Sequence, residues 1–299
     1  MPHVRANGLD IGYEVEGAGP PLILLHGASS SGREGFAAQL PLFRRAFRCY
    51  VPDARGHAST RWNVDDGFRY EWLVDDLAAF STELGLATFH LVGFSMGGAT
   101  ALGFAVRSPE RLRTLVLAGI SADREPRASV ARRLFDPERI RLRDPQWARD
   151  LSRRHDPDQG EGAWERLLPA IARDVAAHDL PGPGDLRRID APTMVVVGDR
   201  DPFVPVDRAW ALRRQLPDAR LLVIPDCGHE VARRKPALFN EALAGFYRST
   251  EAVARRRAEA HAGAGRTTPI GRAEAWTSSL GDSGASAEPD VDWLEEASR

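Results

Sequence analysis

The sequence predicts an α/β protein built on a mostly parallel sheet of about eight strands, with helices on both faces. Short apolar runs, of the kind that form strands buried on both faces, alternate along the chain with segments whose apolar residues recur at helical spacing. This alternation is typical of a sheet whose strands are joined by covering helices. The length of 299 residues suits one large domain, or a domain that carries an insertion.

The chain is expected to open with an antiparallel hairpin. Asn7-Gly8, the preferred pair of a two-residue hairpin turn, lies between residues 4–6 and 9–16. Further along, Leu73, Leu77 and Phe80 share one face of an expected helix. The other expected strands are residues 21–25, 47–51, 90–92, 113–118, 193–197 and 221–224, and the other expected helices lie around 98–106, 209–216 and 238–246.

Two regions differ from this alternating pattern. Residues 121–190 contain no convincing strand run and are rich in Arg, Asp and Pro, while Trp164 and Ile171 belong to a helical face. We expect them to form a helical insertion, which leaves residues 1–120 and 191–248 as the core. From residue 249 the chain is rich in Ala, Gly, Ser and Thr, and we expect a disordered tail over 249–299.

Composition excludes several functional classes. The net charge of −2 at pH 7 creates no global field that would attract nucleic acid or an anionic membrane. No apolar run approaches the length of a membrane span, and residues 1–5 show no apolar leader. Cys49 and Cys227 form no metal-binding spacing, and two free thiols suit a reducing compartment. We therefore expect a cytoplasmic protein without nucleic-acid or membrane partners; its oligomeric state stays open.

The segment Gly93-Phe94-Ser95-Met96-Gly97 follows an apolar strand and precedes a helix of small residues. It has the G-x-S-x-G pattern of a nucleophile elbow, in which a sharp turn presents a serine hydroxyl above a helix N-terminus. Side chains at positions 93 and 97 would collide with neighbouring backbone, so glycine is required there. The amide of Met96 would be an unpaired N–H of the first helical turn, available to an anion.

A serine nucleophile needs a base and a carboxylate that orients the base. Asp201 and His229 each lie in a loop that directly follows an expected strand, and parallel sheets collect functional groups at the carboxyl ends of their strands. The order serine, aspartate, histidine is the one expected for an elbow-bearing sheet. Ser95, Asp201 and His229 are therefore the predicted catalytic residues, with Asp199 and Asp123 as alternatives for the acid.

Taken together, these motifs resemble those of the α/β-hydrolase superfamily over residues 3–248. His26-Gly27-Ala28 resembles its oxyanion loop, and residues 53–59 resemble its D-x-R-G-x-G-x-S turn, with Ala58 in place of a usual glycine. Residues 198–201 and 228–229 resemble its acid loop and histidine motif. The resemblance implies that residues 121–190 form a cap, and that the amides of Ala28 and Met96 form the oxyanion hole.

The resemblance also implies a function. We expect a serine hydrolase that cleaves a carboxylic ester or lactone of small to medium size and partly apolar character, with no cofactor and no metal. The alternatives are a C–C bond hydrolase of vinylogous diketones, a cofactor-free perhydrolase and a non-catalytic ligand-binding protein on the same fold. A serine at position 95 argues against the epoxide hydrolase and haloalkane dehalogenase branches, which use aspartate there.

Several polar residues outside the predicted triad are expected to be structural. His26 and His57 lie in loop motifs whose residues usually make local hydrogen bonds. In the insertion, His155 is expected to face solvent, and arginines such as Arg153 and Arg154 are expected to form a solvated helix face paired with nearby carboxylates.

Overall fold

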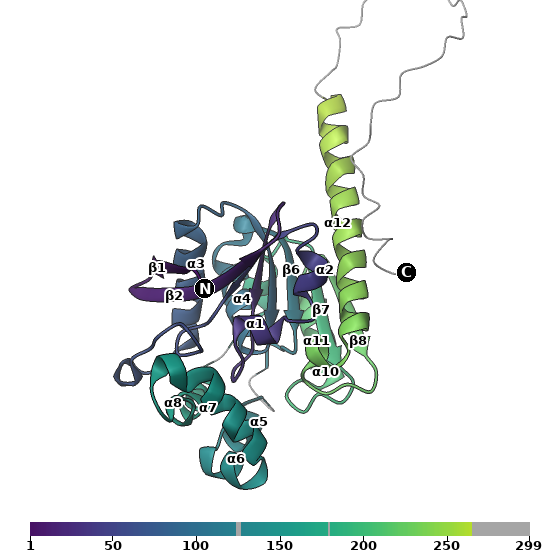
Figure 1. Cartoon of the computed structure of the whole chain (residues 1–299). Coiled ribbons are helices and arrows are strands. Elements are labelled where there is room, and N and C mark those ends of the chain that lie inside the picture. The colour runs from purple at the N-terminus through teal and green to yellow at the C-terminus, as the bar shows by residue number, and fades with distance from the viewer. Residues whose placement is uncertain (124–126, 179, 265–299) are drawn as a thin grey trace, which may run out of the picture. The chain divides into compact units, whose positions relative to one another are not determined.

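A computed structural model describes residues 1–123, 127–178 and 180–264, with side chains described as far as residue 253 (Figure 1). The chain divides into two compact units, Met1–Leu243 and Ala244–Arg299. Of the elements in the described residues, all strands and every helix except the greater part of the last one lie in the first unit.

The first unit is built on a sheet of eight strands in the order β1-β2-β4-β3-β5-β6-β7-β8, as found in the described residues. The two pairings of β2, with β1 and with β4, are antiparallel, and the other strand pairs are parallel. The predicted fold class and the mostly parallel sheet are therefore confirmed. The strands are β1 (His3–Ala6), β2 (Leu9–Glu16), β3 (Pro21–Leu25), β4 (Arg48–Pro52), β5 (Phe89–Phe94), β6 (Leu112–Ala118), β7 (Thr193–Gly198) and β8 (Ala219–Ile224).

The central strands are buried on both faces, which explains their continuous apolar runs. Their register aligns the carboxyl ends: Leu25 of β3 lies opposite Gly93 of β5, and Gly93 lies opposite Leu117 of β6. Because the three strands point the same way, the loops that follow them emerge side by side at one edge of the sheet.

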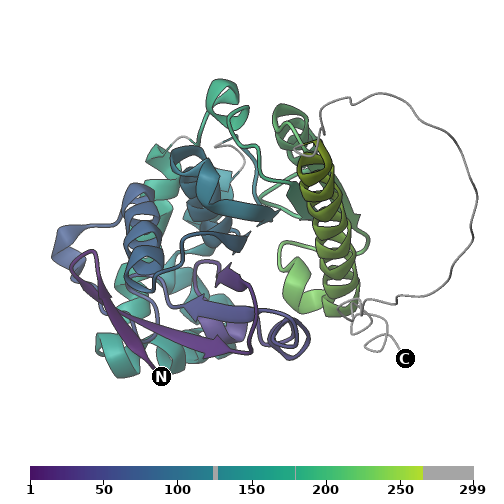
Figure 2. The same ribbon diagram turned by 90° about the horizontal axis from the view of Figure 1, so that it is seen from above.

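Helices join the strands and cover the sheet. In α3 (Tyr70–Glu83) the predicted apolar face is buried, and α3 packs against α4 (Met96–Arg107) on the sheet (Figure 2). The side chain of Gln39 links the region before α2 to residues late in the chain. Its Nε2 donates to the carbonyl of Ala232 and to Oδ1 of Asn240. The remaining elements of the core are α1 (Gly32–Gly35), α2 (Leu40–Phe43), η1 (Val64–Asp66), η2 (Pro109–Arg111), α10 (Val206–Gln215) and α11 (Val231–Arg234).

Between β6 and β7 the described residues form only helices, which appear in teal in Figure 1. The carboxylate of Asp144 caps one of them by accepting the amide N–H of Trp147 at 2.9 Å. Trp164, Leu167 and Ile171 are fully buried along one face of another, as their spacing predicted. These helices are α5 (Arg127–Leu134), α6 (Pro137–Arg143), α7 (Pro145–Gln159), α8 (Ala163–Ala177) and the single turn α9 (Pro183–Leu186), and we call them the insertion.

The last helix corrects one expectation. Helix α12 (Pro236–Ala264) continues past residue 249, so residues 249–264 are helical where the sequence predicted the start of a disordered tail. These residues are rich in Ala, Arg and Glu, which favour helix, and contain no proline. The rest of the predicted tail, residues 265–299, lies outside the described residues. Across the described ranges, none of the helices combines the length and the apolar character that crossing a bilayer requires.

Candidate active site

Ser95 occupies the sharp turn between β5 and α4. Its backbone has φ 53° and ψ −112°, a conformation that is strained for a residue with a side chain. A Cβ atom on Gly93 would lie 2.2 Å from the carbonyl oxygen of Gly97, and one on Gly97 would lie 2.2 Å from the carbonyl oxygen of Leu25. The turn can therefore form only with glycine at both positions, for the steric reason that the motif predicted.

The structure brings the three predicted side chains together. Nε2 of His229 lies 2.8 Å from Oγ of Ser95, and its Nδ1 lies 2.8 Å from Oδ2 of Asp201. The Asp201 side chain is fully buried, and its other oxygen accepts the amide N–H groups of Phe203 at 2.8 Å and Val204 at 3.1 Å. With Asp201 accepting the Nδ1–H, Nε2 of a neutral His229 is free to accept the serine proton.

The two alternative acids lie elsewhere. Oδ1 of Asp199 accepts the amide N–H of Cys227 at 3.0 Å, and hydrogen bonds from backbone amides lower the pKa of Asp199. Oδ2 of Asp123 lies 3.3 Å from Nη1 of Arg208 at the surface. In the described structure neither carboxylate makes a hydrogen bond to His229, so the geometry favours Asp201 as its partner.

The loop after β3 lies against the elbow, since a Cβ atom on Gly27 would be 3.4 Å from that of Ser95. His26 accepts the amide N–H of Ala54 on Nε2 at 3.0 Å, so its Nδ1 carries the proton and donates to the carbonyl of Gly27 at 2.8 Å. Burial lowers the pKa of His26, which keeps this neutral form. That carbonyl shares a peptide plane with the N–H of Ala28, so His26 sets the direction of the Ala28 amide.

Ala28 and Met96 both line the pocket that contains Ser95. Within the described residues, no protein group accepts a hydrogen bond from the backbone amide of either residue. The amide of Met96 is the first N–H of helix α4, where unpaired donors and the helix dipole favour an anion. These two donors have the character that an oxyanion hole requires.

Two cavities meet at Ser95. The outer cleft has a volume of about 640 Å³ and reaches from Ser95 and His229 to α7 of the insertion and to Arg233. The inner pocket has a volume of only about 20 Å³ and also contains Ser95 and His229. Its walls are mostly apolar side chains from the strand ends and the insertion, namely Ile120, Ala131, Phe135, Ile171, Val175 and Phe203.

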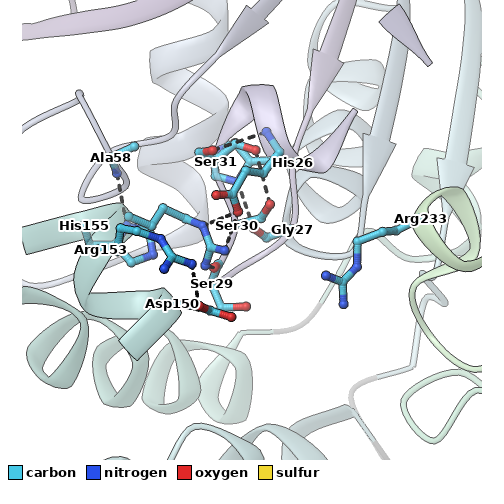
Figure 3. Close-up of polar contacts among 12 residues, drawn as sticks. His26, Gly27, Ser29, Ser30, Ser31, Ala58, Asp150, Arg153, His155 and Arg233 are labelled. Carbon is cyan, nitrogen blue, oxygen red and sulfur yellow. Dashed lines mark hydrogen bonds and ion pairs between the residues drawn. The ribbon is translucent and has the colours of Figure 1, made fainter. Parts of the chain in front are cut away.

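Asp150, Glu230 and Arg233 line the outer cleft, and each is paired with an opposite charge. The partner of Asp150 is Arg153, whose Nη2 lies 2.5 Å from its Oδ1 (Figure 3). Arg233 bonds Glu230. The Arg153 side chain is 71% exposed, as expected for a solvated helix face. Arg154 also pairs with a carboxylate, that of Glu34, but its expected exposure is wrong: the side chain is 14% exposed and turned onto the loop after β3.

His26, at the start of the loop after β3, belongs to a cluster of three histidines. The rings of His26 and His57 are 5.0 Å apart and those of His57 and His155 are 5.4 Å apart, and all three are buried. The expectation that His155 faces solvent is therefore wrong. Burial lowers the pKa of His155 to about 3, and lowers that of His57 well below its usual value. Helical spacing could have indicated its burial, because Leu151 lies one turn earlier on the same face of α7. Its hydrogen-bond partner Ala58, 97 positions away, could not be inferred from local sequence.

The sequence profile of the Alpha/beta hydrolase family matches residues 22–242, and the chain belongs to this family. It is similar to 2-hydroxy-6-oxo-6-phenylhexa-2,4-dienoate hydrolase of Burkholderia cepacia, with 28% identity over 77% of this chain and 88% of the relative. It is equally similar to a Mycobacterium tuberculosis protein named as a candidate non-heme bromoperoxidase, with 28% identity over 82% of this chain and 100% of the relative.

A solved structure has the same fold. The thermophilic esterase of Thermogutta terrifontis is 26% identical, and its TM-score is 0.68 over 84% of this chain and 99% of that chain. The family and these relatives indicate that the protein is an enzyme of the hydrolase class.

Proposed function

We propose that the protein is a serine hydrolase that cleaves a carboxylic ester or lactone through an acyl-enzyme. The observation that carries the proposal is His229, which hydrogen-bonds Ser95 on one side and the buried Asp201 on the other. The strained turn at Ser95 adds to it, because such strain persists where a side chain must be presented in one direction.

The mechanism follows from these contacts. Oγ of Ser95 attacks the acyl carbon while Nε2 of His229 takes its proton, and Asp201 stabilises the imidazolium. The amides of Ala28 and Met96 bind the oxyanion of the tetrahedral intermediate. The intermediate collapses as His229 passes the proton to the leaving alcohol. His229 then deprotonates a water that attacks the acyl-enzyme, and the carboxylic acid leaves with Ser95 restored.

The sizes and linings of the two cavities indicate the class of substrate. The leaving alcohol must lie near Nε2 of His229, and the outer cleft extends from there past Glu230 and Arg233, so it suits a larger and partly polar alcohol group. The acyl group then enters the inner pocket, where about 20 Å³ little exceeds the space that one buried water requires. We therefore propose a short acyl group, with the insertion acting as a cap that closes the acyl side.

Cleavage of a C–C bond is the second candidate. It is supported by the Burkholderia cepacia relative, whose name gives a 6-oxo-dienoate as its substrate. The same triad can serve that reaction, and the products separate the two candidates. An ester releases an alcohol and an acid, whereas a vinylogous diketone releases an enol and an acid.

The test begins with the serine. A fluorophosphonate probe should modify Ser95, located by mass spectrometry of the labelled peptide, and turnover of p-nitrophenyl acetate should accompany it. Ser95→Ala should lower kcat by up to about 10⁶-fold, because loss of a triad serine removes the covalent route. Ser108→Ala, at the other end of α4, is the control and should keep wild-type turnover. Full turnover by Ser95→Ala, or the absence of labelling, would refute the proposal.

A further inference from the structure

Helix α7 of the insertion contacts the loop that carries Ala28. Nη1 of Arg154 donates to the carbonyl of Ser29 at 2.5 Å, and its Nε donates to Oε2 of Glu34 at 2.6 Å. Figure 3 shows Ser29, Ser30 and Ser31 on one side of this contact and residues of α7 on the other. The carboxylate of Glu34 thus orients the guanidinium so that its Nη1 points at the Ser29 carbonyl.

The loop needs such support. Ser29 has φ 69°, in the left-handed region that costs a residue with a side chain about 1–2 kcal/mol. Ala28 lies between two carbonyls that are both held by side chains: His26, at the start of the loop, donates to that of Gly27, and Arg154, on α7, donates to that of Ser29. The Ser29 carbonyl shares a peptide plane with the N–H of Ser30, which donates to the Gly27 carbonyl at 3.3 Å. Rotation of the Ser29 carbonyl would therefore disturb the group that orients the Ala28 amide.

Helix α7 also supports the second anchor. Nδ1 of His155 accepts the amide N–H of Ala58 at 3.1 Å, and Nε2 of Gln159 donates to the carbonyls of Ala58 at 2.9 Å and Thr60 at 2.6 Å. Ala58 has φ 38° and so needs external contacts as well. The same turn supplies the Ala54 amide that fixes the tautomer of His26.

We infer that Arg154 is a positioning residue for the oxyanion hole: helix α7, through Arg154, holds the Ser29 carbonyl and so keeps the Ala28 amide aimed at the oxyanion. The insertion and the oxyanion hole then form one unit, and the donor is in place only while α7 is docked. This inference rests on the proposed serine-hydrolase function and adds to it a positioning role, in the loop that carries Ala28, for a side chain that also lines the outer cleft.

The experiment compares two neighbouring arginines of α7 in the full-length chain. Arg154→Ala should lower kcat for p-nitrophenyl acetate about 10- to 100-fold with KM changed less than about threefold. Complete removal of an oxyanion donor costs about 10²–10³-fold, and a misdirected donor costs less. Arg153→Ala is the control, because Arg153 bonds only Asp150 among the described contacts and should behave as wild type. Arg154→Lys keeps a donor for Ser29 and should recover part of the loss.

A second readout separates positioning from general damage. A trifluoromethyl ketone forms a tetrahedral oxyanion with Ser95, so its inhibition constant for Arg154→Ala should rise by the same factor as kcat/KM falls. Equal activity of Arg154→Ala and Arg153→Ala would overturn the inference, and so would a fall in kcat with unchanged affinity for the ketone. A wild-type protein that neither labels with fluorophosphonate nor turns over an ester would instead refute the proposed function itself.

Discussion

At the scale of single residues, the site depends on which of two nearby carboxylates faces His229. Asp199 and Asp201 belong to one loop, yet Asp201 is buried against the imidazole while Asp199 holds the amide of Cys227. The burial of Asp201 is tolerated because two backbone amides and the imidazole satisfy its oxygens. The acid-loop pattern favours Asp201, and the structure adds the direction in which each carboxylate points.

This difference predicts the effect of two matched substitutions. Asp201→Asn should lower kcat about 10⁴-fold, because the amide can stabilise the wrong tautomer of His229 and no longer stabilises the imidazolium. Asp199→Asn should stay within about threefold of wild type, because an amide oxygen can still accept from Cys227. Steady-state kinetics with p-nitrophenyl acetate would measure both, and a larger loss for Asp199→Asn would reverse the assignment of the acid.

At the scale of elements, helix α8 forms part of the wall of the inner pocket. Ile171 of α8 reaches the pocket beside Ser95, whereas Ile140 of α6 is equally buried in the insertion but does not line it. Truncation to alanine therefore changes the pocket at Ile171 and leaves it unchanged at Ile140, so the two variants form a matched pair.

Ile171→Ala should extend the pocket and shift specificity toward longer acyl groups. A pocket that accommodates one more methylene changes the kcat/KM ratio between two substrates by about 10- to 200-fold. The ratio of kcat/KM for butyrate esters to that for acetate esters should therefore rise at least tenfold. Both truncations should lower the free energy of unfolding by about 2–5 kcal/mol, but Ile140→Ala should leave the ratio of kcat/KM unchanged. A p-nitrophenyl ester series measures the ratio, and a parallel shift in both variants would show that the acyl group lies elsewhere.

At the scale of the whole molecule, buried histidines couple stability to pH. Burial lowers the pKa of His90 and of His155 to about 3, and lowers the pKa of His26 and of His57. In the unfolded chain a histidine titrates near about 6.5. Above that pH both states are neutral and the stability is complete; below it only the unfolded chain takes up protons, so stability is lost as the pH falls toward the folded pKa.

Each of these histidines can remove up to about 1.4 kcal/mol of stability per pH unit below about 6.5. The melting temperature should therefore fall between about pH 6.5 and 5, a window above the titration of most carboxylates. His155→Gln retains an acceptor for the Ala58 amide and does not titrate, so its melting temperature should fall less steeply over this window. An unchanged slope in His155→Gln, measured by calorimetry across buffers, would contradict this coupling.

Much of the fold could be predicted because its signals are local. Each buried strand is a short apolar run, and each covering helix repeats its apolar residues on one face, as at Leu73 and Leu77. The elbow at Ser95 is likewise local, since the two glycines are demanded by backbone within a few residues and by the adjacent strand β3. The end of α12 was missed because helix-forming residues without apolar partners were interpreted as a disordered tail.

The sequence by itself determined the sheet, the elbow and the residues proposed as nucleophile, base and acid, because these depend on short-range patterns and on the common edge of parallel strands. Only the tertiary structure decided what the insertion does. Arg154 reaches Ser29 across 125 positions and His155 is buried against Ala58, whereas Arg153 stays in solvent. The spacing of Trp147 and Leu151 indicates which side of α7 faces inward, but the groups that Arg154 and His155 meet there depend on how α7 packs on the core.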